Sequence, residues 1–264
     1  MTASLCSGQV PNGPLLRVAG LSKHFLGVVA LDNVDLDICP GELASLIGPN
    51  GSGKSTLFNC ITGFLRPDGG QVCYKGEDIT ERRPDQIVLK GISRTFQDVR
   101  VFPSLTVLEN LLVVAQQHQE DSILRRLFRT PSIQKYEAEA VERADRLLDM
   151  VGLMRLRDEP AGNISYGQRK LLAFAAALIP DPDLVMLDEP AAAVSPAMIE
   201  RMKGYIRGLN EKQGKAFLVV EHNMDVVMDL SHRVVVLDIG RKIAEGTPAE
   251  IQGNADVQEA YFGR

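Results

Sequence analysis

Gly48-Pro49-Asn50-Gly51-Ser52-Gly53-Lys54-Ser55-Thr56 is the stretch of sequence that decides the fold. It fills the pattern Gly-x-x-x-x-Gly-Lys-Ser/Thr, in which backbone N–H groups and the positive end of a helix hold nucleotide phosphates. An apolar, strand-like segment (43–47) precedes it and a helix-like segment (57–61) follows it. We therefore expect this phosphate loop to bind a nucleotide triphosphate. Lys54 would reach the β- and γ-phosphates, and the Ser55 hydroxyl would ligate Mg²⁺.

The composition is ordinary for a soluble globular protein: 264 residues, 45% of them hydrophobic and 24% charged. A net charge of −5 argues against a broad nucleic-acid surface. The four cysteines show no C-x-x-C spacing, which argues against a zinc site. No segment approaches the roughly 20 apolar residues that cross a bilayer, so a role at a membrane would require docking onto partners that span it. We interpret residues 1–14, rich in Ser, Gly and Pro, as a disordered leader.

The first third of the chain is rich in strand patterns. Residues 15–19, 28–38 and 71–74 are strand candidates, and residues 69–70 and 75–78 carry turn signals. Together with the phosphate loop, these patterns predict an antiparallel β layer folded against a nucleotide-binding α/β core.

The last third alternates short aliphatic strand candidates with helical segments; the strands are expected at 184–187, 216–220 and 234–237. Such alternation predicts parallel strands in a doubly wound sheet. Between these regions, residues 106–151 have a helical pattern. Within it, residues 122–129 form a short basic amphipathic piece. We favour a solvated helix packed on its neighbour there, over a surface that meets a membrane protein or lipid headgroups.

Two acids follow the apolar strand candidate 184–187. An acid at the carboxyl end of a parallel strand lies at the ligand-binding edge of the sheet. Asp188 could hold Mg²⁺ there, with Ser55 as a ligand from the other side. Glu189 points differently, because it is one residue further along, and could polarise a water for in-line attack on the γ-phosphate.

The long separation between Lys54 and Asp188, with a helical region between them, resembles the ATP-binding cassette (ABC) ATPases. The resemblance covers the chain from about residue 15 to its end. It implies an α/β fold with a P-loop (RecA-like) core, an antiparallel β subdomain and a helical subdomain. The core and β subdomain would span about 15–97 and 181–264, and the helical subdomain, which carries the signature, about 98–180.

The same resemblance implies roles for three further residues. Gln97, in Arg94-Thr95-Phe96-Gln97, matches the glutamine that joins the core to the helical subdomain and touches Mg²⁺ or the attacking water. His222 matches the switch histidine that contacts the γ-phosphate and helps to hold Glu189 and the water. Phe25 matches the aromatic residue that stacks on adenine. ATP and Mg²⁺ are thus the implied cofactors.

The signature segment of the family, Leu-Ser-Gly-Gly-Gln, is matched by residues 164–168 just ahead of an apolar helical segment. Ile164 replaces the leucine and Tyr166 the first glycine, while Ser165, Gly167 and Gln168 keep a capping hydroxyl and free N–H groups at a helix start. In the family this segment completes the nucleotide site of the opposite subunit. The resemblance therefore implies a head-to-tail pair of cassettes.

The loop that follows Glu189 departs from the family pattern, because Ser195 stands where an aspartate is common. This departure puts in doubt the usual role of that position in communication between subunits. The acid pair and the histidine are intact, so we still expect ATP hydrolysis.

Several traits are similar to the ATP-binding subunit of bacterial branched-chain amino-acid uptake systems. They are Tyr166, the Pro-Ala-Ala run at 190–192, the segments 94–97 and 102–106, the tail 260–263, and a helical insertion at 121–137. This branch implies an ATPase that energises import of branched-chain or other hydrophobic amino acids. Its partners would be a second, different cassette chain, transmembrane permeases and, indirectly, a solute-binding protein, with no nucleic acid. It would lie peripherally on the cytoplasmic face of the inner membrane.

Two alternatives stay open. One is a cassette ATPase for another cargo, such as urea, amides or an exported lipid. The other is a non-transport cassette ATPase of translation or DNA repair. Translation relatives usually carry two cassettes in one chain and repair relatives a long coiled coil, and this sequence has neither.

Overall fold

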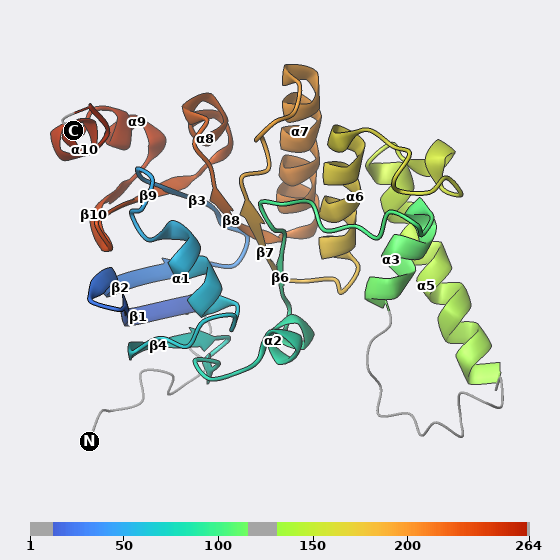
Figure 1. Cartoon of the computed structure of the whole chain (residues 1–264), viewed down its shortest axis with the longest axis horizontal. Coiled ribbons are helices and arrows are strands. Elements are labelled where there is room, and N and C mark those ends of the chain that lie inside the picture. Colours follow the sequence, from blue (N-terminus) through green and yellow to red (C-terminus); the bar gives the residue numbers. More distant parts are fainter. Residues whose placement is uncertain (1–12, 116–130, 263–264) are drawn as a thin grey trace.

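The structure is a computed structural model that describes residues 13–115 and 131–262. The basic piece at 122–129, most of the leader at 1–14 and part of the insertion at 121–137 lie outside the described residues. Two sheets and the helices around them make up the described chain (Figure 1).

The larger sheet has six strands in the order β10-β9-β3-β8-β7-β6. These strands are β10 (Arg241–Gly246), β9 (Arg233–Asp238), β3 (Leu43–Ile47), β8 (Ala216–Val220), β7 (Leu184–Asp188) and β6 (Ile92–Arg94). From β9 to β6 the neighbours are parallel, and β10 joins β9 as an antiparallel edge. The predicted parallel, nucleotide-binding type of sheet is therefore confirmed, with the carboxyl ends of β3, β7 and β8 at one edge.

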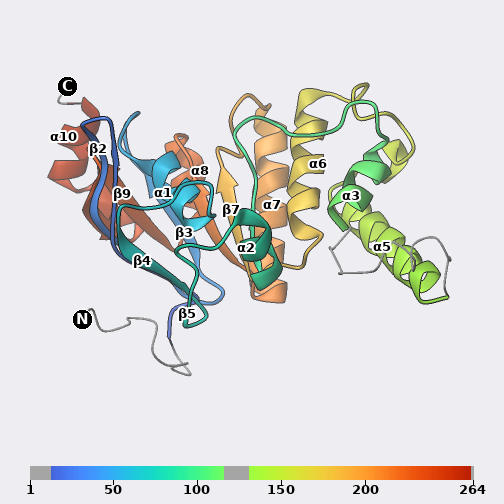
Figure 2. The ribbon, with the colours of Figure 1, turned by 60° about the horizontal axis from the view of Figure 1, so that its bottom comes forward.

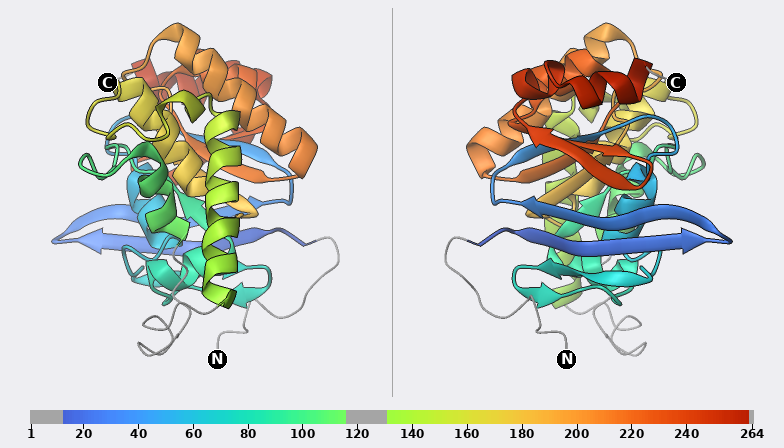
Figure 3. Two further views of the ribbon diagram at one scale, coloured as in Figure 1. Left: turned by 90° about the vertical axis from the view of Figure 1, so that its right-hand side faces the viewer. Right: turned by 90° about the vertical axis from the view of Figure 1, so that its left-hand side faces the viewer.

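The smaller sheet is antiparallel and has four strands: β2 (Val28–Ile38), β1 (Leu16–Phe25), β4 (Gly69–Tyr74) and β5 (Glu77–Asp78). Figure 3 shows β1 and β2 running across the width of the molecule. The sequence led us to expect a turn over 75–78, and this was too long. Lys75 and Gly76 alone form the turn, both with positive φ (50° and 76°). This is the pattern of a two-residue hairpin, so Glu77 already pairs with Tyr74 in β5.

The central parallel strands β3, β7 and β8 are buried on both faces. Successive side chains of a strand point to opposite sides, so each strand contributes to two cores. In β7, Leu184 and Met186 pack into the cluster that fills the space toward the antiparallel sheet. Val185 and Leu187 pack instead into the cluster beneath the helices of the other side. The six-stranded sheet thus separates two apolar cores.

The helices lie around and beyond this sheet. They are α1 (Lys54–Ile61), α2 (Pro84–Lys90), α3 (Val107–Ala115), α5 (Pro131–Met150), η1 (Met154–Leu156), α6 (Tyr166–Leu178), α7 (Pro196–Gln213), α8 (Met224–Leu230), α9 (Pro248–Gln252) and α10 (Ala255–Phe262). Figures 1 and 2 show α3 and α5 at one end of the molecule, beyond α6, and α8 to α10 near β9 and β10. Helices α3, α5 and α6 share the second apolar core. None of the helices in the described residues has the length and apolar character to cross a membrane.

Candidate functional site

The phosphate loop connects β3 to α1 and needs glycine at positions that the chain itself crowds. Gly48 has φ 149°, and a Cβ there would lie 2.1 Å from the carbonyl oxygen of Leu237. Gly53 has φ 104°, and a Cβ there would lie 2.5 Å from the carbonyl oxygen of Ala30. A larger residue at either position would displace backbone, so these glycines are required by the fold of the loop.

Lys54 begins α1 and is turned back onto the phosphate loop. It is 6% exposed, and its Nζ donates hydrogen bonds to the carbonyl oxygens of Gly48 and Pro49, both at 2.8 Å. Burial lowers the pKa of Lys54, while the carboxylates of Glu189 and Asp188 oppose that shift. Asp188, which ends β7, and Glu189, which follows it, therefore lie close enough to act electrostatically on this ammonium group.

Asp188 ends β7 in a buried ion pair with Arg94, the last residue of β6. The Arg94 Nη2 to Asp188 Oδ2 distance is 2.9 Å, and the two side chains are only 8% and 7% exposed. Arg94 also donates from Nη1 to Asn59 Oδ1 at 2.6 Å. Its guanidinium carbon lies 5.0 to 5.9 Å from three aromatic ring centres, those of Phe58, Phe64 and Phe96.

Arg94 was missing from our predicted site, although it stands in the segment Arg94-Thr95-Phe96-Gln97 that the sequence analysis quoted. The signal that could have identified it is its position: Arg94 ends β6, and the neighbouring strand β7 ends at Asp188. Recognising it requires the parallel pairing of Arg94 with Met186, two residues before Asp188, which the sequence does not show.

Glu189 lies between two predicted site residues. His222 Nε2 is 2.7 Å from Glu189 Oε1, and Gln97 Nε2 donates to Glu189 Oε2 at 3.0 Å. Glu189 itself has φ 51°, a left-handed backbone that non-glycine residues seldom adopt. Such a conformation costs of the order of 1–3 kcal/mol and persists where surrounding contacts determine it. The structure thus gathers Gln97, Glu189 and His222 into one cluster.

Glu221 is a second residue that the sequence analysis did not select. It is 3% exposed, and its Oε1 accepts from Ala191 N at 2.6 Å. Its Oε2 accepts from the backbone N–H groups of His222 and Asn223 at 2.9 and 3.1 Å. A buried carboxylate with three such donors joins the loop after Glu189 to the segment that carries His222.

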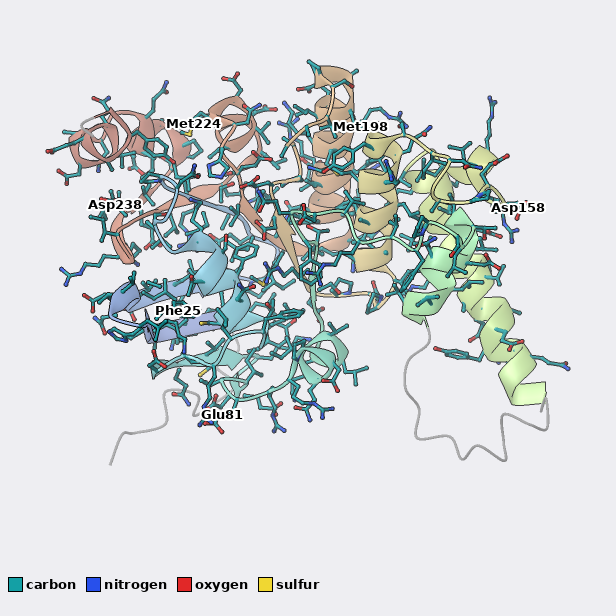
Figure 4. The ribbon with its side chains drawn as sticks, viewed as in Figure 1. Phe25, Glu81, Asp158, Met198, Met224 and Asp238 are labelled. Atoms are coloured by element: carbon teal, nitrogen blue, oxygen red, sulfur yellow. The ribbon has the colours of Figure 1, made fainter. Side chains whose placement is uncertain are left out.

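Two further predicted site residues, Ser55 and Phe25, are exposed. Ser55, in the first turn of α1, is exposed at the surface. Phe25 ends β1 and is 40% exposed, with Lys23 Nζ 5.5 Å from its ring centre (Figure 4). The described residues place no hydrogen bond between Ser55 and Asp188, and Asp188 is engaged by Arg94 instead.

The signature residues begin α6 as a capping box. Ser165 Oγ accepts from Gln168 N at 3.3 Å, and Gln168 Oε1 accepts from Ser165 N at 2.8 Å. Within residues 13–115 and 131–262, no hydrogen bond or ion pair joins these residues to the phosphate loop. Figures 1 and 2 show α1 and α6 on opposite sides of β7. One copy of the chain therefore does not bring its own signature residues to its phosphate loop.

Comparison with known families gives two matches. Residues 31–192 match the family described as ABC transporter. Residues 241–264 match the family described as branched-chain amino acid ATP-binding cassette transporter. The second match falls on β10, α9 and α10, outside the phosphate loop and the signature.

Similar proteins and structures agree with these matches. The chain is 40% identical over 250 residues to the high-affinity branched-chain amino acid transport ATP-binding protein LivG of Escherichia coli (strain K12), covering 95% of this chain and 98% of LivG. The crystal structure of the ADP conformation of MJ1267, an ATP-binding cassette of an ABC transporter, aligns with a TM-score of 0.83 and 38% identity, covering 95% and 99% of the two chains. A dimeric structure of the cassette MJ0796 bound to ADP and Pi aligns with a TM-score of 0.75 and 28% identity, covering 88% and 98%.

Proposed function

The chain belongs to the ABC transporter family, and from that premise we propose that it is the ATP-hydrolysing subunit of an importer of branched-chain or other hydrophobic amino acids. The observation that carries hydrolysis is the convergence of Gln97 and His222 on Glu189, at the sheet edge that also holds the phosphate loop. The similarity to LivG and the match of residues 241–264 support the amino-acid cargo.

ATP binding would replace hydrogen bonds within the phosphate loop by hydrogen bonds to the phosphates. Lys54 Nζ donates to the carbonyl oxygens of Gly48 and Pro49, and the phosphates offer it stronger, charged acceptors. The backbone N–H groups of residues 48–56 would surround the same phosphates. The Phe25 ring, which is 40% exposed, would stack on the adenine.

The residues near the phosphate loop fit a magnesium ion. The Ser55 hydroxyl, the Asp188 carboxylate and the Gln97 amide offer the hard oxygen ligands that Mg²⁺ prefers. Asp188 is oriented by Arg94, whose Nη2 lies 2.9 Å from Asp188 Oδ2. When bound with ATP, Mg²⁺ would neutralise charge on the β- and γ-phosphates.

Glu189 is the residue that would activate water. Its carboxylate can accept a proton from the attacking water, while His222 and Gln97 hold its two oxygens in place. His222 and Lys54 would stabilise the charge that develops on the γ-phosphate. Positioning and electrostatics supply the rate enhancement, as expected for phosphoryl transfer.

We infer that the site is completed by a second cassette. An added Cβ at Gly167 would lie 3.4 Å from the nearest atom of the Met198 side chain, which is an ordinary van der Waals contact. The protomer's own packing therefore does not demand glycine there, in contrast to Gly48. A close approach by the nucleotide of the opposite copy would demand it, with Ser165 and Gln168 at the same helix start.

The remaining partners follow from the transport role. Permease subunits would span the membrane, and the proposed helical subdomain, about residues 98–180, would meet their cytoplasmic loops. A solute-binding protein would deliver the amino acid to the permeases. The chain would then lie peripherally at the cytoplasmic face of the membrane, with the second cassette a different chain.

The catalytic part of the proposal is tested with Glu189→Gln. We expect this variant to bind ATP with an affinity within about threefold of the wild type and to lose at least about 100-fold in turnover, since the amide cannot act as a base. Glu211→Gln, an exposed change on α7, is the control and should leave turnover unchanged. Unchanged turnover in Glu189→Gln would remove this residue from the role of base.

The cargo is tested by transport. Cells that lack this chain should lose high-affinity uptake of radiolabelled leucine, isoleucine and valine, and the wild-type chain should restore it. Uptake of urea and amides should be unaffected. Loss of urea uptake with normal leucine uptake would replace the amino-acid assignment with the alternative cargo.

A further inference from the structure

The loop from Glu189 to Ala193 leaves the sheet in an unusual conformation. Glu189 has φ 51° and Ala193 has φ 58°, so two non-glycine residues of this short loop adopt left-handed backbone. Side chains disfavour this region, so contacts from outside the loop must hold it. The position of the Glu189 carboxylate depends on that backbone.

Lys170 is the side chain that makes such contacts from the α6 side. It is 7% exposed, and its Nζ lies within hydrogen-bonding distance of three carbonyl oxygens of the loop. The distances are 2.8 Å to Glu189, 3.5 Å to Pro190 and 2.5 Å to Ala192. An ammonium group has three N–H donors and no acceptor, which matches three converging carbonyls.

The loop borders a pocket on the α6 side and is anchored from the opposite side as well. A pocket lies behind it, lined by Lys170, Glu189 and Pro190 together with Phe96, Phe174 and Met202. From the opposite side, Glu221 Oε1 accepts a hydrogen bond from Ala191 N. The loop is therefore held between a buried cation on α6 and a buried anion after β8.

The charges of the two anchors act on each other. Burial lowers the pKa of Lys170, and the carboxylates of Glu221 and Glu189 oppose this. Replacing Lys170 by an apolar residue would remove the donor group that faces the three loop carbonyls.

We propose that Lys170 is a positioning residue that fixes the backbone of Glu189–Ala193 and joins it to the signature helix. Ser165, which caps α6, and Lys170 stand on the same helix, little more than one turn apart. A displacement of the start of α6 therefore reaches the backbone of Glu189 through one side chain. In the proposed dimer, Ser165 faces the nucleotide of the opposite copy, so Lys170 would connect that nucleotide to this copy's own base; this last step rests on the proposed function.

The test compares two buried lysines. Lys170→Met keeps the shape of the side chain and removes its donors; Lys203→Met is the control. Lys203 is 8% exposed on α7 and pairs with Glu200 and Asp229, away from the loop. For the full chain, the measurements are the kcat and KM of ATP hydrolysis, the number of binding sites for a fluorescent ATP analogue per chain, and amide hydrogen exchange.

We expect Lys170→Met to lower kcat at least about tenfold, with KM within about threefold and the number of ATP-binding sites unchanged. Exchange should become faster in residues 189–193 and not across the protein. Lys203→Met should leave kcat within about twofold of the wild type. If the methionine variant does not accumulate, Lys170→Gln, which also lacks three converging donors, provides the same comparison.

A kcat within about twofold of wild type in Lys170→Met would overturn the proposal. So would a kcat that falls only in proportion to the number of ATP-binding sites, because that loss reports unfolded protein. A wild-type chain that neither bound nor hydrolysed ATP would instead refute the proposed function. In that case hydrogen exchange in residues 189–193 would still decide whether Lys170 holds the loop.

Discussion

At the scale of single residues, burial separates ion pairs of similar chemistry. Arg94 and Asp188 are 8% and 7% exposed, whereas Arg17 and Asp37 are 42% and 46% exposed in the antiparallel sheet. The charges of an exposed ion pair are solvated in both the folded and the unfolded chain, so the pair contributes little to the free energy of unfolding. Losing one partner of a buried pair leaves the other charge uncompensated in a poorly solvated site.

We therefore predict a large difference between two matched variants. Arg94→Met should lower the free energy of unfolding by about 3 kcal/mol or more, because Asp188 stays buried without its partner. Arg17→Met should cost about 0–1 kcal/mol. Urea denaturation of both variants measures this, and equal losses would show that the Arg94–Asp188 pair is not stabilising the fold.

At the scale of elements, two helices in different parts of the fold begin with the same capping box. Ser165 and Gln168 form the capping box of α6, and Thr247 and Glu250 form that of α9. In both, a hydroxyl accepts from the third backbone N–H and a side chain returns to the cap. Only the first lies in the predicted nucleotide-binding signature.

Ser165→Ala and Thr247→Ala should therefore cost similar stability, about 0.5–2 kcal/mol each. Only Ser165→Ala should weaken the ATP-dependent association with a second cassette. Thermal unfolding measures the first effect and analytical ultracentrifugation with ATP the second. If both variants associated as the wild type does, Ser165 would be a helix cap and nothing more.

Ion pairs connect helices α7 and α8, and they make the stability of the fold depend on pH. Lys203 and Arg207 on α7 both pair with Asp229 on α8. The hydrogen bond from Lys203 is the main cause that lowers the pKa of Asp229 in the folded chain. Because the folded pKa is below the unfolded value of about 3.9, the stabilisation is present above that value and is lost as the pH falls through the folded pKa.

Asp229→Asn should accordingly reduce the free energy of unfolding by about 0.2–1 kcal/mol at pH 7. The difference from the wild type should shrink as the pH falls below about 4. Denaturant titrations at a series of pH values measure it. A difference that stayed constant into the acid range would mean that the Asp229 charge contributes nothing.

At the scale of the whole molecule, the nucleotide site is divided. Helix α1, which follows the phosphate loop, and helix α6, which follows the signature, lie on opposite sides of β7 (Figure 2). Two copies arranged head to tail would bring each phosphate loop to a signature.

We predict that ATP drives association of the Glu189→Gln chain with a second cassette, since bound ATP persists when hydrolysis is blocked. Analytical ultracentrifugation should show the mass of a dimer with ATP and of a monomer with ADP. The control is Lys54→Ala, which should stay monomeric with either nucleotide. A monomer in saturating ATP, with itself or with another cassette chain supplied, would contradict the composite site.

The sequence predicted the fold class and most of the strands that carry the site. The phosphate loop could be read directly, because its glycines are demanded by local backbone geometry at Gly48 and Gly53. Asp188, Glu189 and His222 could be placed because each lies at or just after the carboxyl end of an apolar strand. The functional roles of these residues remain predictions that the variants above address.

Contacts between distant segments were outside the reach of the sequence. Arg94 reaches Asp188 only because β6 and β7 pair in one register. Lys170 reaches the loop 189–193 because α6 packs beside that loop. Glu221 joins the same loop to the segment that carries His222. Local pattern therefore determined what this protein binds, since a phosphate loop is specified by neighbouring residues. The tertiary structure alone decided how its acids are held, because burial and charge pairing depend on which strands and helices come together.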